Sequence, residues 1–263
     1  MHVKPGTKVS LKDYDPGDTG PYSSSDAAKK ETEELLVELK ELQYLLHAEN
    51  RRSLLLVFQG MDTSGKDGAI RHVMAGMTPL GVQIKAFKAP HEEELAHDFL
   101  WRIHQAVPRR GYVGIFNRSH YEDVLVVRVH ELVPKKVWEA RYEQINDFEK
   151  MLTENGTIIL KFFLHISKDE QKERLEERLH DPTRFWKFSL GDVEERKHWS
   201  HYRKAYEDCL SLCSTQWAPW HIIPANKKWY RNALVTRIIV ERVRELKMSF
   251  PKPTIDLDKV VIE

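Results

Sequence analysis

The chain has 263 residues, of which 41% are hydrophobic, so it is long enough to bury a core as one compact domain. Its 41 Lys and Arg residues nearly balance its 40 Asp and Glu residues, which excludes overall charge as the means of attracting a polyanion. Any polyanion must therefore be bound by local clusters of cations. The cysteines, Cys209 and Cys213, lie one helical turn apart, which excludes the disulfide framework of a small secreted protein.

The N-terminal segment has Pro and Gly where a secretory signal needs an apolar centre, and no apolar run approaches the ~18 residues of a membrane span. We therefore expect a cytoplasmic protein that has no membrane partner. Residues 1–25 are rich in Gly, Pro, Ser and Asp, and they predict an extended arm. Ser24, Ser25 and Asp26 are good N-cap residues, and the leucine spacing after them predicts an amphipathic helix over residues 26–49.

Short apolar runs predict the buried strands of a parallel sheet. They cover residues 53–58, 112–116, 157–164 and 220–223, and a weaker alternating run over residues 82–87 predicts an edge strand. Helical patterns lie between them, over residues 67–76, 91–106, 134–154, 168–180, 192–213 and 228–247. Strands that alternate with helices predict a doubly wound α/β fold, here as a single domain over residues 26–263.

Residues 181–201 interrupt this alternation with a basic, aromatic stretch. Pro182 ends one helix, and Gly191 with Asp192 begins another. One interpretation is a helical lid over a ligand site, and the other is an ordinary packed helical hairpin. The pattern alone favours neither.

Residues 60–66, Gly-Met-Asp-Thr-Ser-Gly-Lys, have the G-x4-G-K spacing of a P-loop and stand between an apolar strand and a helix. In such a loop the glycines let successive N–H groups point at phosphate oxygens, and the helix N-terminus adds positive potential. The alternative is a glycine turn followed by a solvent-exposed lysine. We predict that the loop binds phosphate through Gly60, Thr63, Ser64, Gly65, Lys66 and Asp67.

Asp67 stands where a P-loop usually offers a Ser or Thr hydroxyl to magnesium, so a carboxylate must come from elsewhere. Asp62 is the first choice, and its alternative role is a hydrogen bond that stabilises the turn. Asn117 ends the strand over residues 112–116, where such enzymes usually keep a magnesium-associated Asp. We predict Mg²⁺, with Mn²⁺ as a substitute, held by Asp62 and by Asn117 through metal-bound water.

Arg118 follows at the carboxyl edge of the sheet, where ligands bind in open parallel sheets. It can stabilise charge on a transferring phosphoryl group, or it can form a surface ion pair with Glu122 or Asp123. Phe87, at the end of the edge strand, can stack on an adenine, and core packing is its alternative. The predicted nucleotide-binding residues are Phe87, Lys88, Asn117, Arg118 and Glu122.

Arg174 and Arg178 lie four residues apart on a predicted helix, and Lys187 follows in the proposed lid. A site for several phosphates needs cations arranged in a row, which these residues would supply. Glutamates alternate with them, so a solvated, salt-bridged helix face is the alternative.

Five longer motifs occur in order along the chain: GMDTSGKDG, FKAPHEEELAHDFLWRIH, FNRSHYEDVL, DPTRFWKFSLGD and WHIIPANKKWYRN. Together they resemble the polyphosphate kinase 2 family from about residue 30 to residue 247, and FNRSHYEDV resembles the subgroup that phosphorylates both AMP and ADP. The resemblance implies a thymidylate-kinase-like P-loop fold with a helical lid, magnesium dependence and homo-oligomers. It also implies reversible transfer from inorganic polyphosphate to AMP or ADP, the latter giving ATP.

Asp62 and Lys66 match the functional loop of that family, Asn117 and Arg118 match its second motif, and Arg178 with Lys187 match its arginine helix and lid. Glu122 is expected to help define the acceptor pocket. The expected catalytic residues are thus Asp62, Lys66, Arg118 and Arg178.

Two alternative functions remain from the sequence. An ATP-dependent nucleoside monophosphate kinase would share the P-loop, the lid arginines and the α/β architecture. A non-catalytic phosphate- or RNA-binding module would use the same basic face, but the near-zero net charge and the lack of an RNA-binding motif disfavour it, so no nucleic acid partner is expected.

Overall fold

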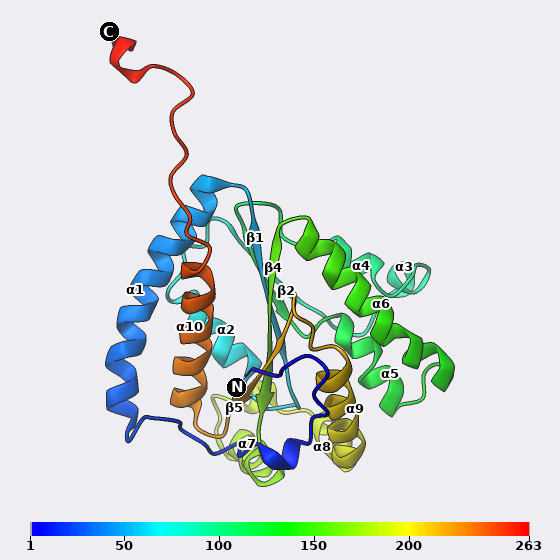
Figure 1. Cartoon of the computed structure of the whole chain (residues 1–263). Coiled ribbons are helices and arrows are strands. Elements are labelled where there is room, and N and C mark those ends of the chain that lie inside the picture. The colour runs from blue at the N-terminus through cyan, green and yellow to red at the C-terminus, as the bar shows by residue number, and fades with distance from the viewer. Residues whose placement is uncertain (1, 263) are drawn as a thin grey trace.

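A parallel sheet with the strand order β2-β3-β1-β4-β5 forms the centre of the computed structural model, which describes residues 2–262 (Figure 1). Both end residues of the chain, and with them the outer bounds of the predicted arm and domain, lie outside the described residues. The strands are β1 (Ser53–Gln59), β2 (Val82–Ala86), β3 (Val113–Asn117), β4 (Thr157–His165) and β5 (Trp220–Pro224). This arrangement confirms the predicted parallel α/β fold.

The central strands are apolar throughout because helices cover both faces of the sheet. In β1 every residue is buried, and in β4 all but the last are. β2 pairs with β3 alone and is mostly exposed, which confirms its predicted position at an edge. Because all the strands run in one direction, the segments that follow Gln59 and Asn117 meet at the same edge of the sheet.

One face of the sheet carries α1 (Ser25–Glu49), α2 (Lys66–Met74) and α10 (Lys228–Arg244), and α10 contacts both of the others. Ser24 caps α1 by accepting a hydrogen bond from the Ala27 N–H, as predicted for this N-cap segment. The other face carries α4 (Trp101–His104), α5 (Val126–Val129), α6 (Lys135–Glu154) and α9 (Trp199–Leu212). Between residues 2 and 262, no helix combines the length and the apolar character that a bilayer crossing requires.

Two predicted helices are each divided in the structure. The prediction of one helix over residues 91–106 is wrong, because the segment forms only the short helices α3 (Glu92–Leu95) and α4. Asp98 accepts a hydrogen bond from the Leu100 N–H at 2.9 Å, and this local turn separates them. The predicted helix over residues 192–213 is likewise two helices, α8 (Leu190–Lys197) and α9, which meet at His198.

The segment that precedes α1 lies against the domain. Val3, Val9 and Leu11 are buried in the hydrophobic core. The Val3 N–H donates to the Trp220 carbonyl at 2.9 Å, and the Ser214 hydroxyl donates to the Val3 carbonyl at 2.6 Å. These bonds attach the N-terminal segment to β5, the strand at the other edge of the sheet, and to the loop that precedes it.

A buried ion pair lies beneath the turn that follows β3. Lys161 on β4 donates to the Glu149 carboxylate at 2.5 Å, and to the Tyr121 hydroxyl and the Cys213 carbonyl at 2.7 Å each. Burial would raise the pKa of Glu149, but Lys161 and His120 lower it below its ordinary value. Because Tyr121 belongs to the turn that carries Arg118 and Glu122, this network fixes the turn to the core.

Replacing Lys161 by Met is expected to lower the free energy of unfolding by about 3–5 kcal/mol, because it leaves the Glu149 carboxylate buried without its cation. Urea denaturation followed by circular dichroism measures the effect. The control is Lys135→Met, which removes an exposed pair with Glu139 on the surface of α6 and should change stability by less than about 0.5 kcal/mol. Equal losses in the two variants would show that the buried pair does not stabilise the fold.

Candidate functional site

The P-loop turns sharply between β1 and α2, and only glycine fits at both of its ends. Gly60 has φ +153°, and a Cβ there would lie 2.7 Å from both the Leu164 carbonyl oxygen and the Ser64 hydroxyl. Gly65 has φ +93°, and a Cβ there would collide with the Arg231 guanidinium. Thr63, between them, also has a left-handed backbone. The loop can therefore pass close to neighbouring groups and still open toward the cavity beside it.

Lys66, the first residue of α2, is folded back over the loop. Its Nζ donates to the Gly60 carbonyl at 2.8 Å and to the Met61 carbonyl at 3.2 Å. Burial lowers the pKa of Lys66 to about 8, with a further contribution from the Arg118 guanidinium, against the opposing effect of Asp62. Lys66 is thus a poorly solvated cation at the wall of the cavity, where an anion would stabilise its charged form.

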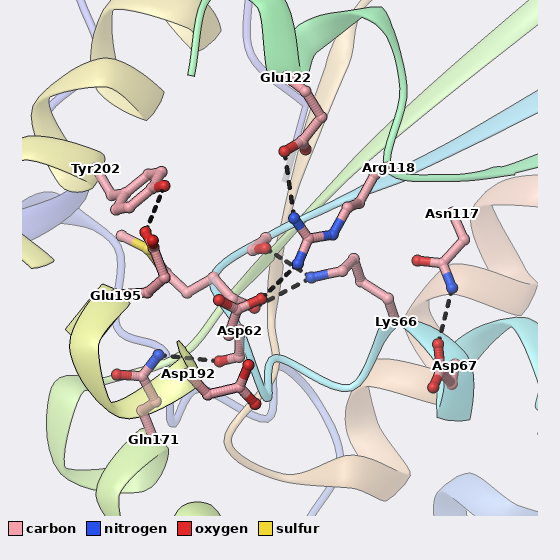
Figure 2. Close-up of polar contacts among 12 residues, drawn as sticks. Asp62, Lys66, Asp67, Asn117, Arg118, Glu122, Gln171, Asp192, Glu195 and Tyr202 are labelled. Carbon is pink, nitrogen blue, oxygen red and sulfur yellow. Dashed lines mark hydrogen bonds and ion pairs between the residues drawn. The ribbon is translucent and has the colours of Figure 1, made fainter. Parts of the chain in front are cut away.

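Arg118 joins the P-loop to the turn after β3 (Figure 2). Its Nη2 donates to Asp62 Oδ1 at 2.7 Å, and its Nη1 donates to Glu122 Oε2 at 3.3 Å. Burial works against the charge of Arg118, but Glu122 and Asp62 outweigh it and raise the pKa of the guanidinium. The predicted ion pair with Glu122 is present, and Asp62 joins it, so the structure brings Asp62, Lys66 and Arg118 together.

Asn117 and Asp67 face each other across the mouth of the loop (Figure 2). The Asn117 Nδ2 donates to Asp67 Oδ1 at 2.8 Å, which leaves the Asn117 side-chain oxygen for another partner. Asp192 on α8 lines the same cavity, and burial together with the nearby Asp62 carboxylate raises the pKa of Asp192 above its ordinary value. Within residues 2–262, no three His, Cys, Asp or Glu side chains converge on one metal position.

The arginines of α7 (Lys168–His180) have different surroundings. Arg174 is buried and donates to Glu170 and to the carbonyls of Thr63, Ala225 and Asn226. The predicted row of phosphate-binding cations is therefore interrupted, because Arg174 supports the backbone of the P-loop. Arg178 points to the lid segment, where its Nη1 donates to Asp192 Oδ2 at 2.8 Å and to the Lys187 carbonyl at 3.1 Å.

A cavity of about 760 Å³ opens beside the loop, in the size range of small-molecule sites. The predicted site residues that line it are Asp62, Thr63, Gly65, Lys66, Asp67, Phe87, Lys88, Asn117, Arg118, Arg174, Arg178 and Lys187. Gly60 and Glu122 instead border a second pocket of about 30 Å³, which also contacts Asp62 and Arg118. The Asp62–Arg118 pair therefore stands between the two pockets.

Ser64 is not presented to this cavity. Its side chain is fully buried, its N–H donates to the Met61 carbonyl at 3.1 Å, and its hydroxyl has no hydrogen-bond partner among the described residues, so its contact with phosphate stays a prediction.

The Phe87 ring, predicted to contact the nucleotide, is packed against other side chains. Its side chain is 3% exposed and packs edge-to-face on Phe116 at 4.9 Å, and Arg102 lies over the ring at 5.5 Å. The ring therefore packs in the core at the edge of the cavity, which favours the alternative of core packing over stacking on an adenine.

Sequence reasoning gave no role to two residues that line the cavity. Trp186, in the lid segment, is 77% exposed, and Lys187 Nζ lies 4.9 Å from the centre of its ring. Arg231, in the first turn of α10, is buried against the P-loop. Both occur in the quoted motifs, DPTRFWKFSLGD and WHIIPANKKWYRN, but the sequence does not show which of the aromatic and basic residues there face the cavity.

Comparisons with known proteins agree with this geometry. The family model described as polyphosphate kinase 2 matches residues 22–251. An AMP/ADP-polyphosphate phosphotransferase of Meiothermus ruber is 52% identical over 99% of this chain and 98% of its own. An ADP-polyphosphate phosphotransferase of Rhodopseudomonas palustris is 46% identical over 97% of this chain and 92% of its own.

Solved structures give the same result. The crystal structure of polyphosphate kinase 2 from Arthrobacter aurescens TC1 superposes with a TM-score of 0.93 at 45% identity, covering 98% of this chain and 95% of that one. The family expected from the ordered motifs is confirmed.

The ammonium group of Lys66 is expected to titrate with a midpoint near pH 8, because burial and Arg118 disfavour its charge. Carbon-13 NMR of the lysine side chains, assigned with Lys66→Ala, measures the midpoint. Arg118→Gln should move it upward, since one of the two causes of the lowering is removed. A midpoint of about 10.4, the usual lysine value, in the unsubstituted protein would contradict the burial of this group.

Proposed function

The chain belongs to the polyphosphate kinase 2 family, and we propose that it transfers a phosphoryl group between inorganic polyphosphate and adenine nucleotides. It would phosphorylate AMP to ADP and ADP to ATP, as the names of the similar enzymes indicate for those proteins. The observation that carries this proposal is the joining of Asp62, Lys66 and Arg118 at the wall of a large cavity lined by cations. Phosphoryl transfer needs little besides such positioning and charge stabilisation.

We propose in-line transfer in which the reacting phosphoryl group lies at the P-loop beside Lys66 and Arg118. The charge on its oxygens would be shared by the two cations, while Asp62 holds the Arg118 guanidinium toward them. The attacking oxygen belongs to a nucleotide phosphate, which is already ionised near neutral pH and needs no strong general base. A covalent enzyme intermediate is therefore unnecessary.

We also propose that Mg²⁺ takes part, with Mn²⁺ as a substitute. Asp62, Asp192 and the side-chain oxygen of Asn117 are hard oxygen donors that fit such an ion, and phosphate oxygens and water would complete its coordination. When bound, the ion would neutralise charge on the phosphates of donor and acceptor. Asp192 would then connect the ion to Arg178, its ion-pair partner at the start of the lid segment.

Residues 181–201 are proposed to act as the lid. Thr183, Arg184, Trp186, Lys187 and Asp192 all line the cavity, so this segment forms one of its walls. Closure over the phosphates would exclude water, which competes with the nucleotide as the acceptor. A cytoplasmic location, expected from the sequence pattern, and a homo-oligomeric assembly, implied by the family resemblance, remain part of the proposal.

The decisive experiment incubates the purified protein with ADP, Mg²⁺ and long-chain polyphosphate, with no ATP supplied. ATP should appear, and parallel reactions with AMP and GDP define the acceptor range. Production of ADP from ATP and AMP in the absence of polyphosphate, without the first reaction, would instead identify an ATP-dependent nucleoside monophosphate kinase. RNA binding without any nucleotide turnover would identify a binding module.

Trp186, with its exposed indole, is proposed to stack on the adenine in place of Phe87. Since stacking of a base on an aromatic side chain is worth about 1–3 kcal/mol, Trp186→Ala should raise the KM for ADP about tenfold and leave the KM for polyphosphate unchanged. Trp186→Phe should restore most of the affinity.

The matched control is Trp217→Ala, which removes a tryptophan that is not among the cavity residues. Tryptophan fluorescence gives an independent measurement. ADP should quench the emission of the unsubstituted protein more strongly than that of Trp186→Phe, and equal quenching would refute stacking at Trp186.

A further inference from the structure

Arg231 is a buried cation that has no carboxylate partner among residues 2–262. Its side chain lies in the first turn of α10, and the residue is only 3% exposed. Nε and Nη2 donate to the neutral Asn232 side-chain oxygen at 3.1 and 2.7 Å. Its other terminal nitrogen, Nη1, has no hydrogen-bond partner in the described part of the chain. Every other arginine that contacts the P-loop, namely Arg118 and Arg174, has a carboxylate within 3.3 Å.

Burial without a counterion is unfavourable for a guanidinium. A charge that is removed from water costs several kcal/mol unless an opposite charge and hydrogen bonds compensate it. The effect is visible in this residue, because burial and then the neighbouring Arg174 lower the pKa of Arg231 to about 10. The folded chain supplies no anion here, so a bound anion would complete the site.

The position of Arg231 indicates which kind of anion would bind beside it. The guanidinium lies directly over the end of the P-loop, since a Cβ on Gly65 would collide with Nη1 and a Cβ on Gly68 would lie 3.1 Å from Nη2. Glycine at both positions therefore leaves room for the guanidinium. Arg231 also lines the 760 Å³ cavity, together with Lys228, which is on the same helix turn.

Arg231 and Arg118 contact opposite ends of the loop. Arg118 pairs with Asp62 and borders both pockets, whereas Arg231 contacts Gly65 and borders only the larger one. A group held by Arg231 is therefore not the reacting phosphoryl group, which is proposed to lie beside Lys66 and Arg118. It lies farther along the large cavity.

We infer that Arg231 forms a subsite for a phosphate of the donor that is not transferred, and that it favours a phosphate chain over a nucleoside triphosphate as the donor. This inference rests on the proposed function. Each unit of a polyphosphate chain carries negative charge, so a chain can place one phosphate at the P-loop and the following units beside Arg231 and Lys228. A nucleoside triphosphate offers only two more charged units after the transferred one, before its uncharged sugar and base, so it supplies less charge to the cations that follow.

Arg231→Gln tests the subsite by removing the charge while retaining a hydrogen-bonding side chain. With ADP as the acceptor, the KM for polyphosphate should rise about tenfold, because a charge-assisted hydrogen bond to phosphate is lost. The KM for ADP should change less than about twofold, since Arg231 contacts the donor. Arg231→Lys, which keeps the charge, should have a KM for polyphosphate between those of the unsubstituted protein and Arg231→Gln. Arg242→Gln, an exposed substitution on the same helix, is the matched control.

Two readouts separate a phosphate subsite from a structural brace of the loop. Calorimetric binding of tripolyphosphate to the protein without nucleotide should weaken in Arg231→Gln and remain unchanged in Arg242→Gln. A brace would instead raise both KM values together and lower the melting temperature, and that result, or an unchanged KM for polyphosphate, would overturn the inference. If Arg231→Gln does not fold, the same comparison of KM values in Arg231→Lys decides the question.

The donor preference has its own measurement. The ratio of kcat/KM for polyphosphate to that for GTP, each used as donor to AMP, should fall in Arg231→Gln, and an unchanged ratio would overturn the claim of selectivity. Failure of the proposed function is distinct from these outcomes, because the unsubstituted protein would then form no ATP from ADP and polyphosphate.

Discussion

The ion pair between Arg118 and Asp62 is the interaction on which the site depends. It joins two segments that are far apart in the chain, the loop after β1 and the turn after β3, at 2.7 Å. Parallel pairing of β1 with β3 places both segments at one edge of the sheet, and the left-handed backbone of Arg118 helps direct its side chain toward the loop. Asp62 alone would repel a phosphate, and without Asp62 the Arg118 guanidinium would keep only its longer contact with Glu122, at 3.3 Å.

Below this pair, the buried Lys161–Glu149 contact holds the turn in place. The Tyr121 hydroxyl accepts from Lys161 and donates to Glu149, so a residue three positions after Arg118 is fixed by a charged network in the core. An apolar residue at position 161 would pack in the same strand, but it would not orient a hydroxyl. The position of Arg118 is thereby determined by residues that are buried in the core.

Much of this arrangement was predictable from the sequence because it follows from local rules. Apolar runs predicted the strands, glycine spacing predicted the P-loop, and the carboxyl edge of a parallel sheet predicted the position of Asn117 and Arg118. The errors concern tertiary packing, to which local patterns are insensitive. Phe87 and Trp186 are both aromatic residues next to lysines, yet one lies in the core and the other is exposed on the cavity. Arg174 and Arg231 are equally basic in sequence. Only the structure shows that Arg174 donates hydrogen bonds to Glu170 and to backbone carbonyls.

The cations around the cavity differ in how their charge is compensated, and this difference organises the site. Arg118 and Arg178 have carboxylate partners, so their positions are fixed before any ligand binds. Lys66 and Arg231 are poorly compensated, and burial lowers the pKa of each. A bound phosphate gains most from the uncompensated cations, because it supplies the charge that the fold omits. The Lys66 ammonium contacts the carbonyls of Gly60 and Met61, whereas the Arg231 guanidinium lies against Gly65, so the two poorly compensated cations stand at opposite ends of the P-loop. The attraction for phosphate therefore extends along the loop, and the paired arginines orient what binds there.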